Sequence, residues 1–429
     1  MTGFIGVFVI LLIAYLYSSN RKAIDWRLVG IGMFLTITLA ILVLGIPVLG
    51  IKGPLRLLFS LANDAIIGVL DFTQKGSEFL FGSLMNIEKS GYIFAFQVLP
   101  TIIFMASIMA VLYHLGIMQK VVSGLAWTMQ KTLRISGAES LSTAANIFVG
   151  QTEAPLLVKP FVERMTRSEL YCIMAGGMAN AAGGVLAAYV GLLRDRIPDI
   201  AGHLITMSVM SAPASIVIAK MIMPETEKPE TLTVLPSSGE KIDSNVIEAA
   251  ARGASEGLGL AVNVGAMLLA FIALITMVNA GIYHIGHWID FPSWGVDLVP
   301  TAFLTDGKAE LTFQVILGWI FAPLAWVMGI PMNEAATAGA FLGEKVVLNE
   351  FVAYLHLTDV ASQLSTHTVL ILSYALCGFA NFSSIAIQIG GIGGMAPSRR
   401  SELAQLGIKA VVGGSLATFL VATIAGLLN

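Results

Sequence analysis

The sequence predicts an all-α polytopic membrane protein with eight transmembrane helices, two re-entrant hairpins and interfacial helices. The first observation is composition: the 429-residue chain is 56% hydrophobic and 12% charged, with a mean hydropathy of +0.83, which is typical of membrane proteins. The second is that apolar stretches near the roughly 20 residues needed to cross a bilayer recur along the chain. The third is an internal repeat, which predicts that the second half of the fold is inverted relative to the first.

Eight continuous apolar stretches are the clearest candidates for spans. They occupy residues 3–18, 28–49, 93–117, 171–193, 203–223, 258–284, 368–393 and 404–428. The first lacks a basic region before it and a small-residue cleavage site after it, so we interpret it as a retained span rather than a signal peptide. Three other apolar stretches have the pattern of amphipathic helices at the membrane interface: residues 55–71, 121–133 and 313–328.

Two further apolar stretches, residues 139–161 and 331–357, are interrupted by glycine, proline and carboxylates. This pattern suits a hairpin that enters the membrane and turns back, because non-helical backbone is tolerated at that depth only where protein or a water-filled cavity covers it. Residues 224–245 are rich in proline, serine and charge, which predicts a solvent loop between two halves of the chain.

Lysine and arginine predict the orientation, since they are enriched in cytoplasmic loops. Arg21, Lys22 and Arg27 follow the first span and place its C-terminal end in the cytoplasm. The remaining basic residues support both termini outside, although Arg194 and Arg196 run against the bias. The net charge of −3 argues against nucleic acid as a partner.

A four-residue motif, GMAN at residues 177–180, recurs as GFAN at residues 378–381, each in the middle of a long apolar span. Each copy follows a hairpin candidate that contains a glutamate, and each is followed by a short polar link and another span. One clear span, residues 258–284, lies between the two copies. Because the number of spans between them is odd, the second copy has the opposite orientation in the membrane. Inverted repeats with interrupted helices near the midplane are typical of secondary transporters, whose substrate and ion sites lie at the breaks.

Carboxylates inside the membrane mark functional sites because they are costly there. Glu153 and Glu350 are the two best placed, one in each hairpin. Gln151 and Thr152 add an amide and a hydroxyl that suit the edge of an uncharged heterocycle. The alternative for this pair is that they satisfy backbone groups freed by the hairpin's own turn.

The second motif stands in the segment CGFANFSSIAIQ, residues 377–388, where the helix is expected to unwind. Asn381, Ser383 and Ser384 offer hydrogen-bond partners there, and Phe379 offers an aromatic face for a planar ring. The alternative is that the asparagine hydrogen-bonds between helices and that Phe379 packs. Two asparagines at equivalent repeat positions, each near a hairpin carboxylate, favour a binding site.

Enzyme signatures are missing from the sequence, which contains no HExxH, GxSxG, P-loop or metal-spaced set of cysteine and histidine. We therefore expect neither catalysis nor an organic cofactor, and an ion gradient is left as the energy source. A channel or a substrate sensor with a transporter-like fold stays open as another class, because it differs from a transporter in binding without accumulation.

Three motifs that occur in order carry a resemblance to a known family. They are GQTEAPLLVKPF at residues 150–161, GEKVVLNEFVAY at 343–354 and CGFANFSSIAIQIGGIG at 377–393. Together they resemble the concentrative nucleoside transporter family, and the resemblance covers the chain from about residue 93 onward and, less distinctively, the first two spans.

The resemblance implies a homotrimer in the bacterial cytoplasmic membrane, in which each protomer has a trimerising scaffold and a transport domain that moves as an elevator. It also implies sodium-coupled uptake of nucleosides, or proton-coupled uptake in some members. The implied parts are the scaffold (1–118), the first transport repeat (119–223), the polar loop and an interfacial helix (224–257), a scaffold span and connection (258–310) and the second transport repeat (311–429).

The resemblance also implies roles for individual residues. Those that would face the nucleobase, with two packing residues beside them, are Gln151, Thr152, Glu153, Val185 and Phe379. Those that would hold the ribose hydroxyls are Glu350, Asn381 and Ser384. The sodium ion would be bound by two asparagine side chains and by main-chain carbonyls near two further residues: Asn146, Asn180, Val149 and Ala181.

Two details of the first hairpin and its span refine this assignment. Relatives that couple to protons tend to carry Ser-Glu after the glutamine, so the Thr152-Glu153 pair favours sodium. Other members tend to carry serine or threonine at the position of Asn180, which makes the transfer of that sodium ligand a departure from the family pattern.

Overall fold

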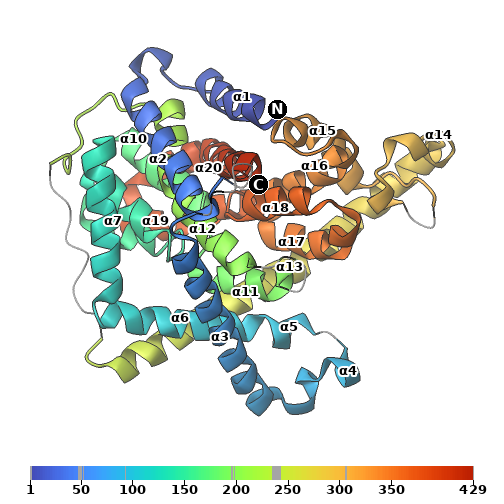
Figure 1. The fold of residues 1–429 in the computed structure, drawn as a ribbon, viewed down its shortest axis with the longest axis horizontal. Helices are drawn as coiled ribbons and strands as arrows, with labels where there is room; N and C mark the ends of the chain where they lie inside the picture. Colours follow the sequence, from blue (N-terminus) through green and yellow to red (C-terminus); the bar gives the residue numbers. More distant parts are fainter. Residues whose placement is uncertain are drawn as a thin grey trace.

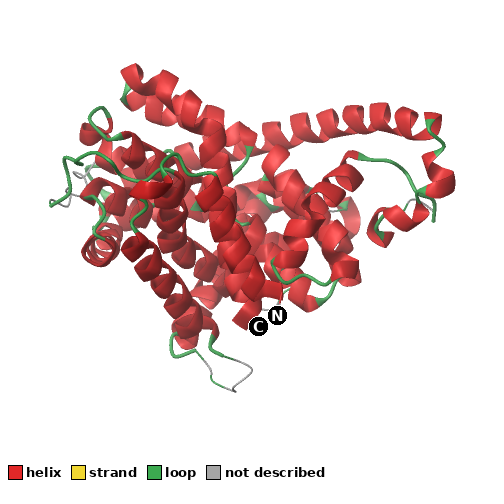
Figure 2. Ribbon diagram, turned by 90° about the horizontal axis from the view of Figure 1, so that it is seen from above, coloured by secondary structure: helices red, strands yellow, loops and turns green. Residues whose placement is uncertain are grey.

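The computed structural model describes residues 2–46, 51, 53–91, 93–194, 197, 199–233, 243–304 and 307–428. Within these residues the chain folds into helices joined by loops (Figures 1 and 2). An isolated antiparallel bridge pairs Ile46 with Ile51. Arg196 and residues 234–242 of the predicted polar loop lie outside the described residues.

The N-terminal part of the chain supplies helices that surround the rest. They are α1 (Thr2–Leu16), α2 (Trp26–Leu44), α3 (Arg56–Phe81), α4 (Ile87–Ser90), α5 (Phe94–Gln97), α6 (Leu99–His114) and α7 (Ile117–Leu133). The helix predicted over 55–71 extends to Phe81. In α7 the buried side chains recur every three or four residues, at Val122, Ala126 and Met129, so this helix has one face against the protein, as an amphipathic pattern requires.

Each predicted repeat contains a hairpin, a broken helix and a long final helix. The first, predicted over 119–223, begins within α7 and continues with α8 (Gly137–Ala145), η4 (Ala154–Val158), α9 (Lys159–Val162), α10 (Arg167–Met178), α11 (Gly183–Leu193) and α12 (Ile200–Ile222). The second consists of α15 (Phe313–Val327), α16 (Met332–Val347), α17 (Glu350–Val360), α18 (Thr366–Leu376), α19 (Phe382–Met395) and α20 (Arg400–Leu428). Between them lie α13 (Val246–Trp288) and α14 (Phe291–Trp294).

Both spans that carry the repeated motif are broken at that motif. The span predicted over 171–193 divides into α10 and α11, and the span predicted over 368–393 divides into α18 and α19. Side-chain caps fix where these elements begin: Thr166 and Glu169 form a reciprocal capping box at the start of α10, and the Asn381 side chain caps α19. The expectation that the helix unwinds within CGFANFSSIAIQ is therefore confirmed.

The second hairpin, predicted over 331–357, is occupied by α16 and α17, which are separated by Leu348 and Asn349. The stretch 313–328, predicted to be interfacial, forms α15, which meets α16 at an angle of 118°. Gly329, with a φ of +108°, and Pro331 form the turn between them. A Cβ on Gly339 would lie 2.7 Å from the Ala322 nitrogen, so a glycine is needed for this close packing of α15 and α16.

Burial divides the long helices into two groups. Most residues in the apolar windows of the repeat helices are buried: 83% in α10–α11, 89% in α12 and 78% in α20. The corresponding fractions are 33% in α2, 17% in α3, 28% in α6 and 22% in α13. The repeats therefore form the interior of the molecule, and the other helices present apolar surface outward.

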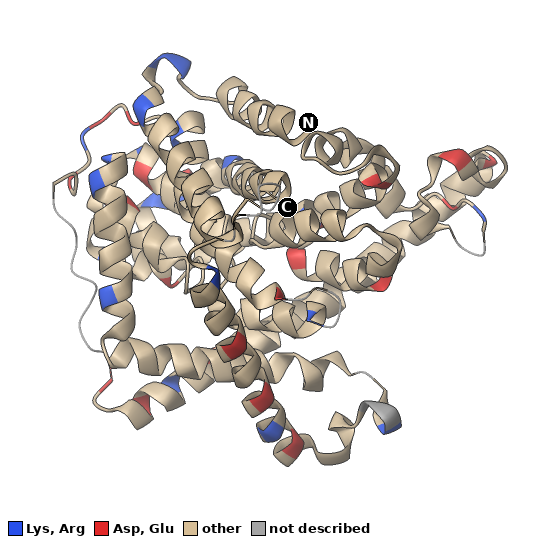
Figure 3. Ribbon diagram, viewed as in Figure 1, with Lys and Arg blue, Asp and Glu red and all other residues tan. Residues whose placement is uncertain are grey.

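The membrane class predicted from composition is confirmed by the helices. In the described part of the chain, seven helices are long and apolar enough to cross a membrane, or eight with the bent pair of α15 and α16. The span predicted over 258–284 belongs to the 43-residue helix α13, which runs out from the body toward α14 (Figures 1 and 2). The two chain ends lie side by side (Figure 1), and most charged segments lie at the edge of the molecule (Figure 3).

Candidate binding site at two broken helices

The two helix breaks, one from each repeat, contact each other through their backbones. The N–H of Phe379 donates to the carbonyl oxygen of Asn180 at 3.2 Å. A Cβ on Gly378 would lie 3.1 Å from the carbonyl group of Ala179, so the glycine of the second motif lets the chains approach this closely. The polar centres of the two repeats therefore form one site in the interior of the protein.

Glu350 is the carboxylate at this site. It is the first residue of α17, directly after the capping residue Asn349, and only 5% of its surface is exposed. The Tyr189 hydroxyl donates to Oε1 at 2.7 Å, and the Asn381 amide donates to Oε2 at 3.0 Å. An ionised carboxylate can accept about four hydrogen bonds, so Glu350 keeps capacity for further donors.

The cap of α19 fixes the orientation of the Asn381 amide. Its Oδ1 accepts from the Ser384 backbone N–H at 2.9 Å and from the Ser383 hydroxyl at 2.7 Å. Since these donors hold the oxygen at the helix terminus, the amide nitrogen points to Glu350. The unwound segment, the helix start and the carboxylate therefore form one hydrogen-bonded unit.

Gln151 connects the tip of the first hairpin to α19. Its Nε2 donates to the Ser384 hydroxyl at 3.0 Å, and its Oε1 accepts from Gln388 Nε2 at 3.0 Å. Gln388 also donates to the Met174 carbonyl oxygen at 3.0 Å, while its own Oε1 is buried without a partner. The two repeats thus share an amide network, and that unpartnered oxygen is free to accept a hydrogen bond.

The other residues predicted to face a nucleobase have more varied positions. Thr152 packs against α19, where a Cβ on Gly391 would lie 2.5 Å from its methyl group. Glu153 is exposed at the hairpin tip, and a Cβ on Gly150 would overlap its carboxylate. Val185 is buried in α11. Among the described residues, hydrogen bonds join Gln151 but not these three to the rest of the predicted site.

The predicted sodium ligands lie at the first break. The Asn146 side chain, at the end of α8, donates to the Gly176 carbonyl oxygen at 2.7 Å. Asn180 accepts from the Ser211 hydroxyl of α12 at 2.6 Å. The buried Ala181 and the partly buried Val149 lie in the adjoining loop segments.

The backbone also joins the first hairpin to the first break. The Gly183 N–H, at the start of α11, donates to the Phe148 carbonyl oxygen at 3.1 Å. A Cβ on Gly183 would lie 2.9 Å from that oxygen, so the glycine permits the contact. The hairpin tip and the α10–α11 break are therefore held together by their main chains.

Several buried polar atoms at this break have no hydrogen-bond partner. They are Thr143 Oγ1, Asn180 Nδ2 and Ser208 Oγ. A Cβ on Gly176 would lie 3.6 Å from the Thr143 hydroxyl, which places that hydroxyl beside the carbonyl that Asn146 contacts. Buried polar groups are normally satisfied, and hydroxyl, amide and carbonyl oxygens are ligands that hard cations prefer.

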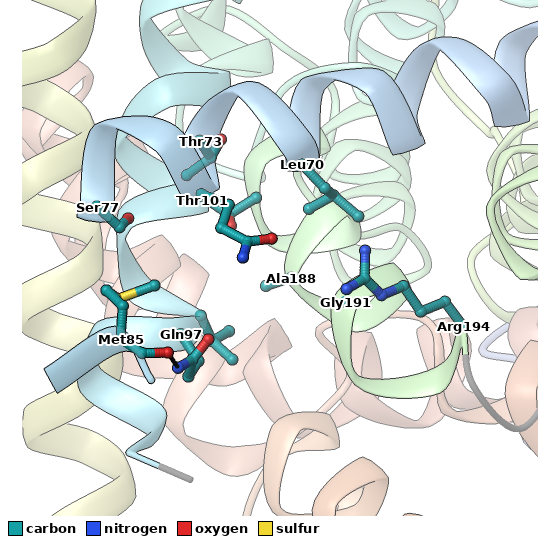
Figure 4. Close-up of a pocket in the computed structure, with 11 residues that line it drawn as sticks. Leu70, Thr73, Ser77, Met85, Gln97, Thr101, Ala188, Gly191 and Arg194 are labelled. Atoms are coloured by element: carbon teal, nitrogen blue, oxygen red, sulfur yellow. Dashed lines mark hydrogen bonds between the residues drawn. The ribbon is translucent and has the colours of Figure 1, made fainter. Parts of the chain in front are cut away.

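A separate cavity of about 120 Å³ lies between α3, α6 and α11 (Figure 4). Its polar lining consists of hydroxyl, amide and guanidinium groups from Thr73, Gln74, Ser77, Gln97, Thr101 and Arg194. Ala188 and Gly191 of α11 line it as well, and Tyr189, which binds Glu350, is the neighbour of Ala188. The cavity therefore lies at the border between α11 and the helices outside the repeats.

Sequence reasoning did not assign Tyr189 or Gln388 to the site. Tyr189 lies four residues after Val185 on a helix, a spacing that places both on one face. Gln388 lies four residues after Ser384, and it is fully buried. Extending the prediction by four residues along the same helix face, from Val185 and from Ser384, would have identified both.

Three family models match consecutive parts of this chain. The model "Na+ dependent nucleoside transporter N-terminus" matches residues 5–84, "Nucleoside recognition" matches 95–196, and "Na+ dependent nucleoside transporter C-terminus" matches 203–426. Because the last of these alone covers more than half of the chain, the match concerns the whole fold and not a local motif.

Individual relatives agree with these models. An "Uncharacterized transporter" of Haemophilus influenzae is 45% identical over 434 residues, which cover 100% of this chain and 97% of that protein. The solved structure of CNTnw in an inward-facing substrate-bound state is 44% identical, with a TM-score of 0.87 over 100% of this chain and 97% of that one. A doubly substituted CNTnw in an outward-facing state has a TM-score of 0.88 at the same identity and coverage. The chain belongs to the Na+-dependent, concentrative nucleoside transporter family, whose members are membrane transporters and not enzymes.

Proposed function

We propose that this protein is a sodium-coupled symporter that concentrates nucleosides across the bacterial cytoplasmic membrane by an elevator-type movement. The observation that carries the proposal is the buried unit of Glu350, Asn381 and Tyr189, positioned where the two broken helices meet. Secondary transporters built from inverted repeats bind their substrates at such breaks. The family membership provides the substrate class.

The ribose would bind at Glu350 and Asn381. Sugar hydroxyls are donors as well as acceptors, and the two carboxylate oxygens accept one hydrogen bond each from the protein, which leaves lone pairs for two hydroxyls. Ser384, whose hydroxyl accepts from Gln151, would hold a ribose hydroxyl as well. The base would bind toward Gln151, with the half-buried Phe379 ring as a stacking surface.

The coupling sodium would bind at the first break. Asn146, Asn180 and the unpartnered hydroxyls of Thr143 and Ser208 supply oxygen ligands beside the last-turn carbonyls of α10. Helix C-termini carry partial negative charge, which favours a cation there. Since Phe379 hydrogen-bonds to the Asn180 carbonyl, an ion at this break would order the segment that holds the substrate.

The division of burial supports an elevator that moves within a fixed scaffold. The repeat helices form the interior, while α3 and α13 present large exposed apolar side chains such as Phe72, Leu269 and Met277. Part of that outer surface would face lipid, and part would face the other protomers of a homotrimer. A polar cavity separates part of α11 from the outer helices. Because of this cavity, α11 would slide past those helices without disrupting a tightly packed apolar interface. Both termini would lie outside the cell.

Uptake into proteoliposomes tests this proposal. Labelled uridine is expected to accumulate under an inward sodium gradient and to stop when choline replaces sodium. Uptake that follows an imposed pH gradient in choline would instead establish proton coupling. Saturable binding without accumulation would favour the channel or sensor alternative. Unlabelled adenosine and guanosine as competitors would define the base preference.

Replacing Asn146 with leucine is expected to raise the sodium concentration for half-maximal uridine uptake by about tenfold, because one oxygen ligand is lost and the Gly176 carbonyl loses its donor. Sodium activation curves at saturating uridine measure the effect. Asn63→Leu is the matched control, since Asn63 is also buried but lies on α3. An unchanged sodium curve for Asn146→Leu would remove this residue from the ion site.

Replacing Gln388 with leucine is expected to weaken uridine binding by about tenfold, because Gln151 loses the donor that orients its amide. The ratio of affinities for uridine and 2′-deoxyuridine is expected to stay constant, since the ribose partners are untouched. Calorimetric titration with both nucleosides measures this. A change confined to the deoxyuridine ratio would place Gln388 at the sugar instead.

A further inference from the structure

Lys345 is a fully buried lysine at the second helix break. It lies near the end of α16, with 0% of its surface exposed. Its Nζ donates to the Ala375 carbonyl oxygen at 2.6 Å and to the Thr418 hydroxyl at 2.7 Å, and it lies 5.4 Å from the centre of the Phe419 ring. A buried ammonium group is costly unless such partners compensate it. Its three contacts therefore form a cation-binding site that a side chain of the protein itself occupies.

The carbonyl that Lys345 contacts belongs to the end of a half-helix. Ala375 lies in the last turn of α18, three residues before the glycine of the GFAN motif. Last-turn carbonyls have no partner within their own helix, and the helix dipole gives them partial negative charge. A cation at this position is therefore favoured by the break itself.

The first break has the same arrangement of parts. A hairpin side chain, Asn146, donates to the Gly176 carbonyl in the last turn of α10, and a hydroxyl from the following long helix, Ser211, contacts Asn180. At the second break the hairpin side chain is Lys345 and the hydroxyl of the following long helix is Thr418. At the first break, the side chains that make these described contacts are neutral amides and a hydroxyl. At the second break, one of the contacting groups is the ammonium group of Lys345.

We propose that the Lys345 ammonium group is the built-in cation of the second repeat, in the position that the exchangeable sodium ion occupies in the first. This inference rests on the proposed function. Lys345 precedes Glu350 by five residues, just before the turn from α16 to α17. The fixed charge holds the end of α18 in place, so the ribose site at the break after α18 is positioned at all times. Lys345 is a positioning residue for the ribose site, and the exchangeable sodium ion binds only at the first repeat.

Two substitutions separate the charge of Lys345 from its volume. Lys345→Met keeps an unbranched side chain, one atom shorter than lysine, and removes the charge, and it is expected to weaken uridine binding at saturating sodium by about tenfold. Lys345→Ala leaves space for a soluble amine, and added propylammonium is expected to restore its uridine affinity to within about threefold of wild type. Propanol, which has the same chain without the charge, is expected to have no effect. Lys409→Met on α20 is the matched control, since Lys409 contacts Tyr17 instead of the site.

The outcomes distinguish this inference from the proposed function. If the wild-type protein shows no sodium-dependent uridine binding, the proposed function fails. If the wild type binds and Lys345→Met binds equally well, only the inference is overturned. The inference is also overturned if folded Lys345→Ala, checked by gel filtration, gains nothing from propylammonium. Should the alanine variant not fold, Lys345→Arg decides the matter: it is expected to bind uridine more tightly than Lys345→Met, and the reverse order contradicts the proposal.

Discussion

Replacing Glu350 with glutamine is expected to weaken uridine binding by about 100-fold, the loss that corresponds to about 3 kcal/mol. Both carboxylate oxygens accept from protein donors, Tyr189 on one side and Asn381 on the other. Glutamine has one oxygen and one NH2 group, so one of these donors would face another donor. The variant therefore loses lone pairs for ribose and disturbs the groups that orient the site.

Deoxynucleosides identify the contact that Glu350 makes. Titration calorimetry with uridine, 2′-deoxyuridine and 3′-deoxyuridine is expected to show a strong preference for uridine in the wild type, and a much smaller one in Glu350→Gln. Glu334→Gln is the matched control, since Glu334 also accepts two hydrogen bonds, both from Ser365 at the start of α18. Wild-type affinity and an unchanged preference in Glu350→Gln would exclude this residue from the ribose site.

The sequence was sufficient to predict both helix breaks, because each break is marked by an asparagine in an otherwise apolar span. It was less sufficient for the charged residues within the second hairpin. We predicted that carboxylates interrupt the stretch 331–357, yet α16 runs through Glu344 and the adjoining Lys345. The Glu344 carboxylate lies 2.9 Å from His356 Nδ1, and Lys345 is held by α18 and α20. These partners come from tertiary structure, so the sequence around the two charges did not reveal that a helix would tolerate them.

The residues of the candidate site also fall into two groups: those that the sequence predicted, and those whose partners depend on tertiary structure. Glu350 and Asn381, predicted from their position in the repeats and from the family motif, are hydrogen-bonded to each other. Gln388 was missed because a single glutamine in an apolar helix is commonly a packing residue, and its partner Gln151 is 237 residues away in the chain. Local patterns predict which residues are unusual, whereas pairing across the repeats depends on how the two breaks meet.

A disulfide between Met105→Cys and Gly184→Cys is expected to abolish nucleoside transport. Met105 lies on α6, which belongs to the proposed scaffold, and Gly184 lies on α11, which belongs to the proposed moving part. A Cβ on Gly184 would lie 3.7 Å from the Met105 Cβ, close to the mean of about 3.8 Å in disulfides. This separation of the two Cβ atoms suits a disulfide bond.

We assign α6 to the proposed scaffold because it packs closely on α13. Cβ atoms on Gly253 and Gly257 of α13 would lie 2.6 Å and 2.8 Å from the Cβ atoms of Ala110 and Ala106. Glycines at these positions bring the two helices into close backbone contact, so α6 and α13 form one body. Gly184 packs against this body from the repeat side, at Ile102 and Met105, so a bond there joins the two parts that an elevator must separate.

Transport and binding must be measured on the same cross-linked protein. Oxidation is expected to lower sodium-driven uridine uptake to background, and dithiothreitol is expected to restore it, while uridine binding in detergent persists because the Glu350 site is not touched. The single-cysteine variants are the controls, and native Cys172 and Cys377, which are buried and unpaired, are common to all of them. If the oxidised protein transports as fast as the reduced one, α11 does not move against α6, and the elevator assignment of these two helices is wrong.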